Sequence, residues 1–191
     1  MKILVPYEQG ALDSLCGVYS LINAMRILIK DLDYKEAERV FRRILRYVES
    51  KKRLSSVITG GIGDREVFNI ARAVLQTKYN IRIRRLYEDD QRPTPSKVVA
   101  KMAKLLQHEN VAIIISIEAV DYEHWSVIKS ISAKEIQLCD SAGTKRVQLS
   151  KCTTKRITQN RPVLIDPSCL FCLSRINRES KTPRNAKRPV A

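Results

Sequence analysis

A cysteine near the start of the chain has the type and position needed for nucleophilic catalysis. Cys16 begins a stretch whose apolar residues recur every three or four positions, which predicts an amphipathic helix from about Ser14, with Asp13 or Ser14 as its N-cap. The free backbone N–H groups and the dipole at a helix start favour the thiolate, which is the form that attacks carbonyl carbons. Because most free cysteines are simply buried small residues, this interpretation needs a base beside Cys16.

Two histidines could supply the base. His108 follows the polar end of a helix predicted at 96–107, and the helix dipole alone accounts for a histidine there. His124 instead begins an apolar strand, and the next strand ends at Asp140. If the hairpin turns about Ser132, His124 and Asp140 are directly opposite, with Cβ atoms about 4.5–5.5 Å apart. The carboxylate could then accept the imidazole N–H and fix its tautomer, whereas a slip of one residue would separate the two side chains.

A glutamine upstream of the cysteine completes a catalytic set. Gln9 lies seven residues before Cys16, across a turn at Gly10, so its side-chain amide could return to the helix start and donate to an oxyanion together with the Cys16 N–H. The alternative is a solvated surface glutamine. The reaction that such a set supports is acyl transfer, in which the thiolate attacks a carbonyl, His124 protonates the leaving amine, and water or another amine takes the acyl group.

The elements expected around these residues are helices first and strands afterwards. Apolar periodicity predicts further helices at 33–49, after Asp64, and at 96–107. Short β-branched or apolar runs predict strands at 81–86, 111–117, 124–131, 135–140, 146–149, 162–165 and 170–176. From 111 onward the connections are too short for crossover helices, so these strands should be mostly antiparallel. The order of the elements predicts an α+β fold.

Two other motifs have weaker chemical interpretations. Residues 59–63 contain three of the six glycines but lack the Lys-Ser/Thr ending of a phosphate-binding loop, so we expect a mobile loop beside a cleft. Cys169 and Cys172 could bind zinc together with Cys139 and Cys152, but no second pair has the spacing of metal ligands. We therefore expect a buried strand there, with no metal and no other cofactor.

Length, charge and cysteine count limit the class of protein. The chain has 191 residues, enough for one domain, which we expect at 1–174 with a basic tail at 175–191. Five cysteines, no signal peptide and no long apolar run predict a cytoplasmic protein with reduced thiols and no membrane partner. The 35 Lys and Arg residues against 20 Asp and Glu give a net charge of +15, which points to an acidic partner or a nucleic acid.

Three segments of the chain, 9–23, 124–128 and 140–143, resemble the papain-like cysteine peptidase superfamily. The shared feature is the chain order of a glutamine, a cysteine on a helix, a histidine on a strand and then an aspartate. The segments look most like the bacterial branch that cuts after double-glycine leaders, which commonly has Asp in place of Leu15 and Pro in place of Ser141. The resemblance implies a papain-like fold, with a helical half that contains the nucleophile and an antiparallel sheet half. It assigns the roles of nucleophile, base, orienting acid and oxyanion donor to Cys16, His124, Asp140 and Gln9, in that order.

These features predict a thiol-dependent peptidase or isopeptidase that prefers glycine or another small residue just before the scissile bond. Its partner would be a protein or peptide substrate, and an acidic or ubiquitin-like protein would suit the positive charge. The same residues would also serve a thiol acyltransferase or a deamidase. The alternative of a different class is a basic module, on an inactive peptidase scaffold, that binds protein or nucleic acid. Against it, aromatic residues make up only 6% of the chain and no nucleic-acid-binding signature is recognised.

Overall fold

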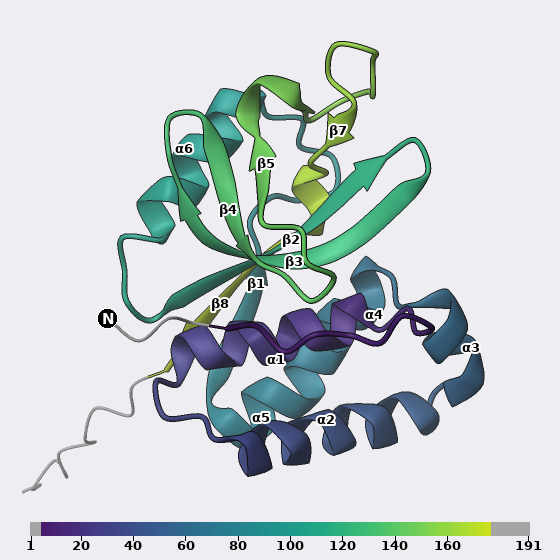
Figure 1. The fold of residues 1–191 in the computed structure, drawn as a ribbon. Coiled ribbons are helices and arrows are strands. Elements are labelled where there is room, and N and C mark those ends of the chain that lie inside the picture. The colour runs from purple at the N-terminus through teal and green to yellow at the C-terminus, as the bar shows by residue number, and fades with distance from the viewer. Residues whose placement is uncertain (1–4, 177–191) are drawn as a thin grey trace, which may run out of the picture.

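Helices fill the first part of the chain and strands the second in the computed structural model, which describes residues 5–176 (Figure 1). The helices are α1 (Cys16–Leu28), α2 (Tyr34–Glu49), α3 (Leu54–Gly60), α4 (Asp64–Ile70), the π-helical η1 (Ala71–Gln76), α5 (Thr77–Tyr79), α6 (Pro95–Leu105) and the 3₁₀ turns η2 (Leu149–Lys151) and η3 (Pro167–Cys169). The strands are β1 (Ile81–Arg85), β2 (Val111–Ala119), β3 (Tyr122–Ile131), β4 (Glu135–Cys139), β5 (Arg146–Gln148), β6 (Cys152–Thr153), β7 (Val163–Leu164) and β8 (Leu170–Arg175). The predicted α+β class is confirmed.

The strands form one sheet in the order β1-β8-β2-β3-β4-β5. Every neighbouring pair along this path is antiparallel, as the short connections predict. β7 pairs with β2 and also, in parallel, with the two-residue strand β6, which the sequence does not predict. The long β2–β3 hairpin lies at the middle of this order, so β3 has hydrogen-bonded strands on both sides.

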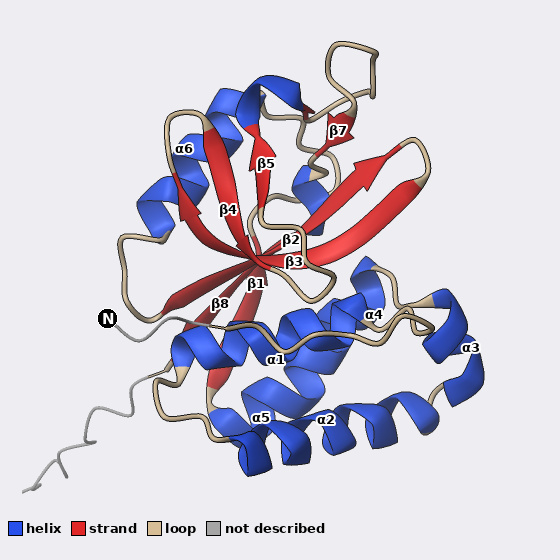
Figure 2. Ribbon diagram, viewed as in Figure 1, coloured by secondary structure: helices blue, strands red, loops and turns tan. Residues whose placement is uncertain are grey.

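Hydrophobic cores lie on the two faces of the sheet. Successive residues of β2 alternate between them, with Ile114 in the core beneath α1 and Ile113 in the core that includes Val98 and Met102 of α6. Figure 2 shows α1 to α5 gathered on one side of the sheet and α6 on the other. Because burying one such aliphatic side chain contributes about 1.5–3 kcal/mol, these contacts fix α1 against the sheet.

The first helix begins two residues later than the sequence predicts. α1 starts at Cys16, and its N-cap is Leu15, so no side chain caps its first turn. The Asp13 carboxylate instead accepts hydrogen bonds from the backbone N–H groups of Gly10 (2.7 Å) and Leu15 (3.0 Å), which stabilises the turn before the helix. The predicted cap at Asp13 or Ser14 is therefore wrong. The later start places Cys16 at the first helical position.

The segment between α2 and α4 also differs from the prediction. Part of the glycine-containing stretch 59–63, expected as a mobile loop, belongs to helix α3. α3 ends where Gly61 has a φ of +74°, a left-handed conformation that favours glycine. The next helix, predicted after a cap at Asp64, begins one residue earlier, at Asp64 itself, and its N-cap is Gly63.

Two further expectations concern the basic tail at 175–191 and the absence of a membrane partner. Arg175 is the last residue of β8 and pairs with Ile81, whereas residues 177–191, which make up most of the expected basic tail, lie outside the described residues. Within residues 5–176, no helix is both long enough and apolar enough to cross a membrane.

Candidate active site

The sheet holds a histidine–aspartate pair at the place where the sequence predicts one. The His124 Nε2 and Asp140 Oδ2 atoms are 2.6 Å apart, and the two residues are only 3% and 4% exposed. The other carboxylate oxygen, Oδ1, accepts backbone N–H groups of Ala142 (2.8 Å) and Thr144 (2.9 Å). Both oxygens of Asp140 are thus engaged, so the carboxylate is held in position against the imidazole.

The strand register that produces this pair is not the predicted one. A turn centred on Ser132 would place Ile128 opposite Ile136, whereas the structure pairs Ile128 with Leu138. A β-bulge lies just after Ile128, where the register of β3 against β4 shifts by one residue. Next to the site, the observed pairing of β3 with β4 differs from the predicted pairing by two residues. Side chains alternate between the two faces of a sheet with a period of two, so His124 and Asp140 still lie on the same face and meet diagonally.

Cys16 is half-buried at the first position of α1, the helix that packs against the strand of His124. Burial alone would lower the pKa of His124, but hydrogen bonding to Asp140 and to Cys16, together with their charges, raises it to about 9. Burial likewise would raise the pKa of Asp140, but the hydrogen bond and charge of His124 lower it below its ordinary value. At neutral pH, His124 is therefore expected to be an imidazolium paired with the Asp140 carboxylate.

The other four cysteines lie in less reactive surroundings. Cys139, Cys152 and Cys172 are buried, and Cys169 is half-buried. Burial raises the pKa of Cys139, raises that of Cys152 to about 11 and, with the nearby Asp166 charge, raises that of Cys169 to about 12. The three thiols with raised pKa values stay protonated at neutral pH, and Cys172 is buried, so Cys16 is the thiol whose position suits catalysis.

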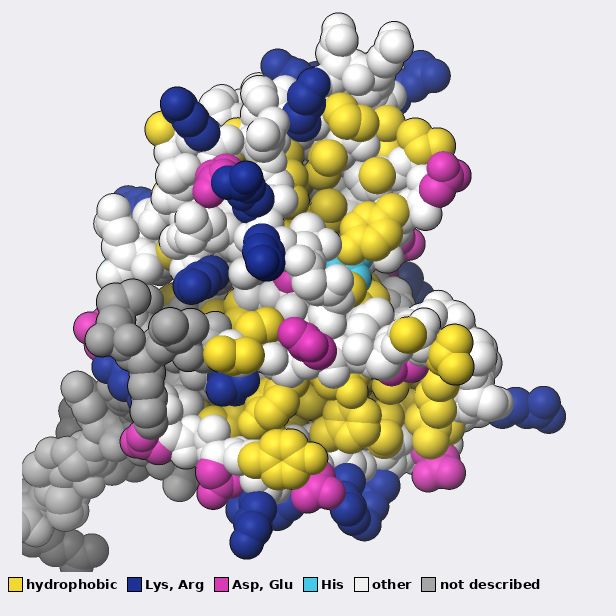
Figure 3. Space-filling model, viewed as in Figure 1, with side chains coloured by type: hydrophobic (Ala, Val, Ile, Leu, Met, Phe, Trp, Pro, Cys, Tyr) yellow, Lys and Arg dark blue, Asp and Glu magenta, His cyan; other side chains and the backbone are white. Residues whose placement is uncertain are grey.

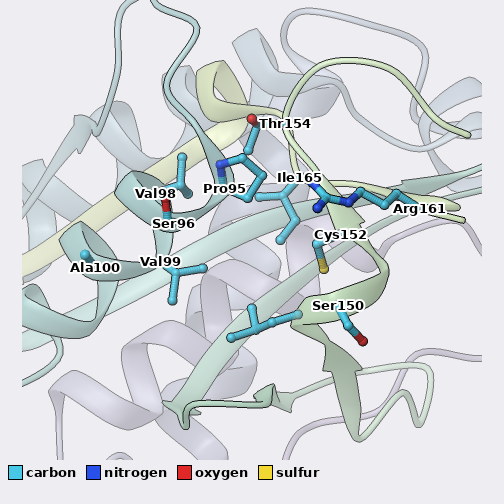
Figure 4. Close-up of a pocket in the computed structure, with 11 residues that line it drawn as sticks. Pro95, Ser96, Val98, Val99, Ala100, Ser150, Cys152, Thr154, Arg161 and Ile165 are labelled. Atoms are coloured by element: carbon cyan, nitrogen blue, oxygen red, sulfur yellow. The ribbon is translucent and has the colours of Figure 1, made fainter.

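A pocket elsewhere in the molecule contains none of the candidate catalytic residues. It has a volume of about 570 Å³ and lies between the start of α6 and the chain around η2 and β6 (Figure 4). Cys152 is in its wall, but the thiol is buried and donates to the Gln148 carbonyl at 3.3 Å. Among the residues that the structure describes, no three His, Cys, Asp or Glu residues are grouped so that they could hold a metal ion.

Gln9 lies beside the candidate triad without reaching the thiol. Its backbone N–H donates to the Ser141 carbonyl (3.0 Å), and its side-chain oxygen accepts from the Ser141 hydroxyl (3.2 Å). Its amide Nε2 donates to the Asp13 carbonyl over 3.4 Å, a long bond that is easily exchanged. The structure therefore brings Gln9 next to the residue after Asp140, while its oxyanion role stays a prediction.

An aromatic residue that the sequence analysis did not single out covers the imidazole. The ring of Tyr122 stacks on His124 with centroids 5.4 Å apart and an interplanar angle of 23°. Its hydroxyl lies 3.4 Å from Thr144 Oγ1, and 42% of the residue is exposed. Burial raises the pKa of the Tyr122 hydroxyl, and the negative charge of Asp140 adds to this effect. The signal for this contact was the spacing of two residues along a strand, which puts both rings on one face.

The last turn of α3 and the residues that follow it hold the start of α1 in place. Ser14 donates through its backbone N–H to the Ile58 carbonyl (2.7 Å) and through its hydroxyl to the Thr59 carbonyl (2.9 Å). Trp125, next to the candidate base, donates from its indole Nε1 to the Ile62 carbonyl (3.0 Å). One short segment therefore contacts both the residues before α1 and the strand of the histidine.

The second histidine takes no part in this arrangement. α6 ends at Leu105, and His108 lies exposed in the following turn, where its backbone N–H donates to the Leu105 carbonyl. The sequence-based preference for His124 therefore agrees with where the structure places the two rings.

Comparison with known proteins does not assign the chain to a family. No protein-family model matches the chain, and no curated protein is significantly similar to it. The arguments about function therefore rest on the geometry of the site and on the chemistry of its residues.

Proposed function

We propose that this protein is a thiol-dependent peptidase or isopeptidase of the papain-like type. The observation that supports this most is the buried His124–Asp140 pair, 2.6 Å apart, with Cys16 at the start of the helix that packs against the strand of His124. A nucleophile, a base oriented by a carboxylate and a helix N-terminus together form the arrangement on which thiol acyl transfer depends.

The reaction proceeds through a covalent acyl-enzyme. The Cys16 thiolate attacks the carbonyl carbon of the scissile bond, and the carbonyl π electrons move to the oxygen. As the tetrahedral intermediate collapses, the C–N bond breaks and the His124 imidazolium transfers its proton to the leaving amine. Neutral His124 then takes a proton from water, which attacks the thioester carbonyl. The C–S bond breaks, the acid product leaves, and the thiolate–imidazolium pair is restored.

The oxyanion is stabilised at the start of α1. Because no side chain caps the first turn of α1, its N–H groups, that of Cys16 among them, are available to the developing negative charge. Gln9 supplies a second donor by exchanging its long hydrogen bond to Asp13 for one to the substrate oxygen. These donors stabilise the transition state more than the neutral carbonyl of the ground state.

The substrate is a protein or peptide with glycine or another small residue just before the scissile bond. This preference rests on the resemblance of 9–23, 124–128 and 140–143 to the peptidases that cut after double glycine. The net charge of +15 favours an acidic protein as the partner.

The test is a cleavage profile over a peptide library randomised at the two positions before the scissile bond. We expect cleavage mainly after glycine, and none by the Cys16→Ala variant. The Cys169→Ala variant, which removes the other half-buried thiol, should cleave like the native chain. A preference for large residues would reject the proposed specificity, and activity that survives Cys16→Ala would reject the mechanism.

A further inference from the structure

A groove of about 500 Å³ adjoins the candidate triad on the sheet side. It lies between the segment before α1 and the strands β3 to β5, and its lining includes Glu8, Lys129, Gln137, Asp140, Lys145 and Arg146. Since Asp140 is both a wall of the groove and the partner of His124, the groove ends at the candidate active site.

Among the charged side chains of this groove that have no ion-pair partner within residues 5–176, cations outnumber carboxylates. Lys129 and Lys145 are exposed, and neither forms an ion pair within residues 5–176. Arg146 has one carboxylate partner, Glu135, at 3.5 Å. Of the three carboxylates in the lining, Asp140 is paired with His124 and Glu135 with Arg146, so Glu8 is the one that has no ion pair within residues 5–176. Figure 3 shows Lys and Arg side chains gathered over the part of the molecule where Figure 1 draws β4 and β5.

Regular strands hold these cations in place. Gln137 of β4 pairs with Ser130 of β3 on one side and with Arg146 of β5 on the other. Lys129 is at the bulge between β3 and β4, and the Lys145 carbonyl accepts the backbone N–H of Leu138 (3.0 Å). The backbones of all three basic residues are therefore fixed relative to Asp140, as a recognition surface requires.

We propose that this groove binds acidic side chains of the polypeptide substrate, a few residues away from the scissile bond. The inference rests on the proposed function, because a polypeptide whose carbonyl reaches Cys16 must continue past the walls of the site. The three cations complement Asp and Glu side chains. The groove has no Phe, Tyr or Trp in its lining on which nucleic acid bases could stack, so an acidic peptide fits it better than a single-stranded nucleic acid does.

The experiment compares two fluorescent peptides that share a Gly-Gly centre and have either four Glu or four Gln residues on both sides of it. Binding to the full chain is measured by anisotropy at low and high salt. The Lys129→Gln/Lys145→Gln variant removes two groove charges. The Lys35→Gln/Lys78→Gln variant removes two charges from exposed lysines of the helical half, so both variants have the same net charge.

We expect the native chain to bind the Glu peptide about tenfold more tightly than the Gln peptide at low salt, and less selectively at high salt. The groove variant should lose most of this preference, while the control variant keeps it. Equal binding of the two peptides, or an equal loss in both variants, would overturn the inference. Tighter binding of a single-stranded oligonucleotide of the same charge, lost in the groove variant, would reassign the groove to nucleic acid.

A separate readout keeps the two proposals distinguishable. A neutral Gly-Gly peptide with a thiol-reactive electrophile at its end reports on Cys16 without using the groove. If that probe leaves Cys16 unmodified in every variant, the proposed function fails, while the anisotropy still decides whether the groove binds acidic peptides. If the probe modifies Cys16 equally well in all variants and the peptides show no preference, only the groove inference fails.

Discussion

At the scale of single residues, the Asp140 carboxylate binds both the backbone of the following turn and the candidate base His124. One carboxylate oxygen accepts two N–H groups of the turn that follows, and the other faces the His124 imidazole. The turn therefore sets the direction of the carboxylate, and the carboxylate sets the orientation and the charge of the ring. Because the pair is nearly buried, solvent screens this interaction little.

Replacing Asp140 by asparagine removes the negative charge of the side chain but keeps nearly the same shape. An asparagine carbonyl can still accept the backbone N–H groups, but the loss of the negative charge lowers the pKa of His124 and favours the wrong tautomer. We expect turnover to fall by roughly 10²- to 10⁴-fold with the fold intact, as for other oriented histidines. Steady-state cleavage of a Gly-Gly peptide measures this, with Asp121→Asn as the exposed control. Unchanged turnover would remove Asp140 from the site.

The charge of His124 also predicts how stability depends on pH. Its pKa of about 9 in the folded chain lies above the ordinary value of 6.5, so the imidazolium stabilises the fold fully below about pH 6.5. This contribution is lost as the pH rises through about 9. Urea unfolding between pH 6 and pH 10 should show a decrease in the free energy of unfolding that the His124→Gln variant lacks. The same slope in both proteins would contradict the ion pair.

Substitution of Gln9 tests its proposed role as a hydrogen-bond donor to the oxyanion. Removing one donor of an oxyanion hole typically costs about 10²- to 10³-fold in turnover, and we expect this loss for Gln9→Ala. The Ser141→Ala variant removes only the hydroxyl that holds the Gln9 side chain, so its turnover should fall much less. The two variants are compared by kcat for one peptide. Equal losses would show that Gln9 acts through the position of its loop.

At the scale of elements, the strands and long helices were predictable because their hydrophobic periods are strong. The α3 helix (Leu54–Gly60) was missed because its Ser, Thr, Val and Gly residues have weak helix propensity, and it forms through its contacts with the residues before α1. The hairpin register was wrong because the bulge in β3 leaves no clear pattern in the sequence. The candidate site survived this error because a shift of two residues preserves the sheet face.

The start of α1 depends on a glycine with little room around it. A Cβ on Gly17 would lie 2.6 Å from Ile62 Cγ1, whereas a Cβ on Gly60 would meet no atom within 4 Å. We expect Gly17→Ala to lower the free energy of unfolding by about 1–3 kcal/mol, because overpacking outweighs the gain in helix propensity. Gly60→Ala is the matched control and should be near neutral.

Urea unfolding measures both alanine variants. The double variant Gly17→Ala/Ile62→Ala relieves the clash, so the cost of Gly17→Ala should be smaller in that background. Additive losses would show that Ile62 does not limit the space at Gly17.

At the scale of the whole molecule, the candidate site joins parts of the chain that are far apart in sequence. Cys16 comes from the helical half, and His124 and Asp140 come from the sheet. Packing of α1 on β2 and β3 brings them together, and the segment 58–62 stabilises that contact through hydrogen bonds to Ser14 and Trp125. The other four cysteines are buried or half-buried, and one of them, Cys139, lies next to Asp140 in the core beneath α1.

The most direct test of the account compares the alkylation rates of all five thiols in the native chain at neutral pH. Iodoacetamide labelling followed by mass spectrometry of the peptides assigns a rate to each cysteine. We predict that Cys16 reacts much faster than the other four, because it combines partial exposure with a position at a helix start and the imidazolium of His124. The His124→Ala variant should lose most of this difference. Equal rates at all five thiols, or a fast Cys16 that does not respond to His124→Ala, would contradict the proposed triad.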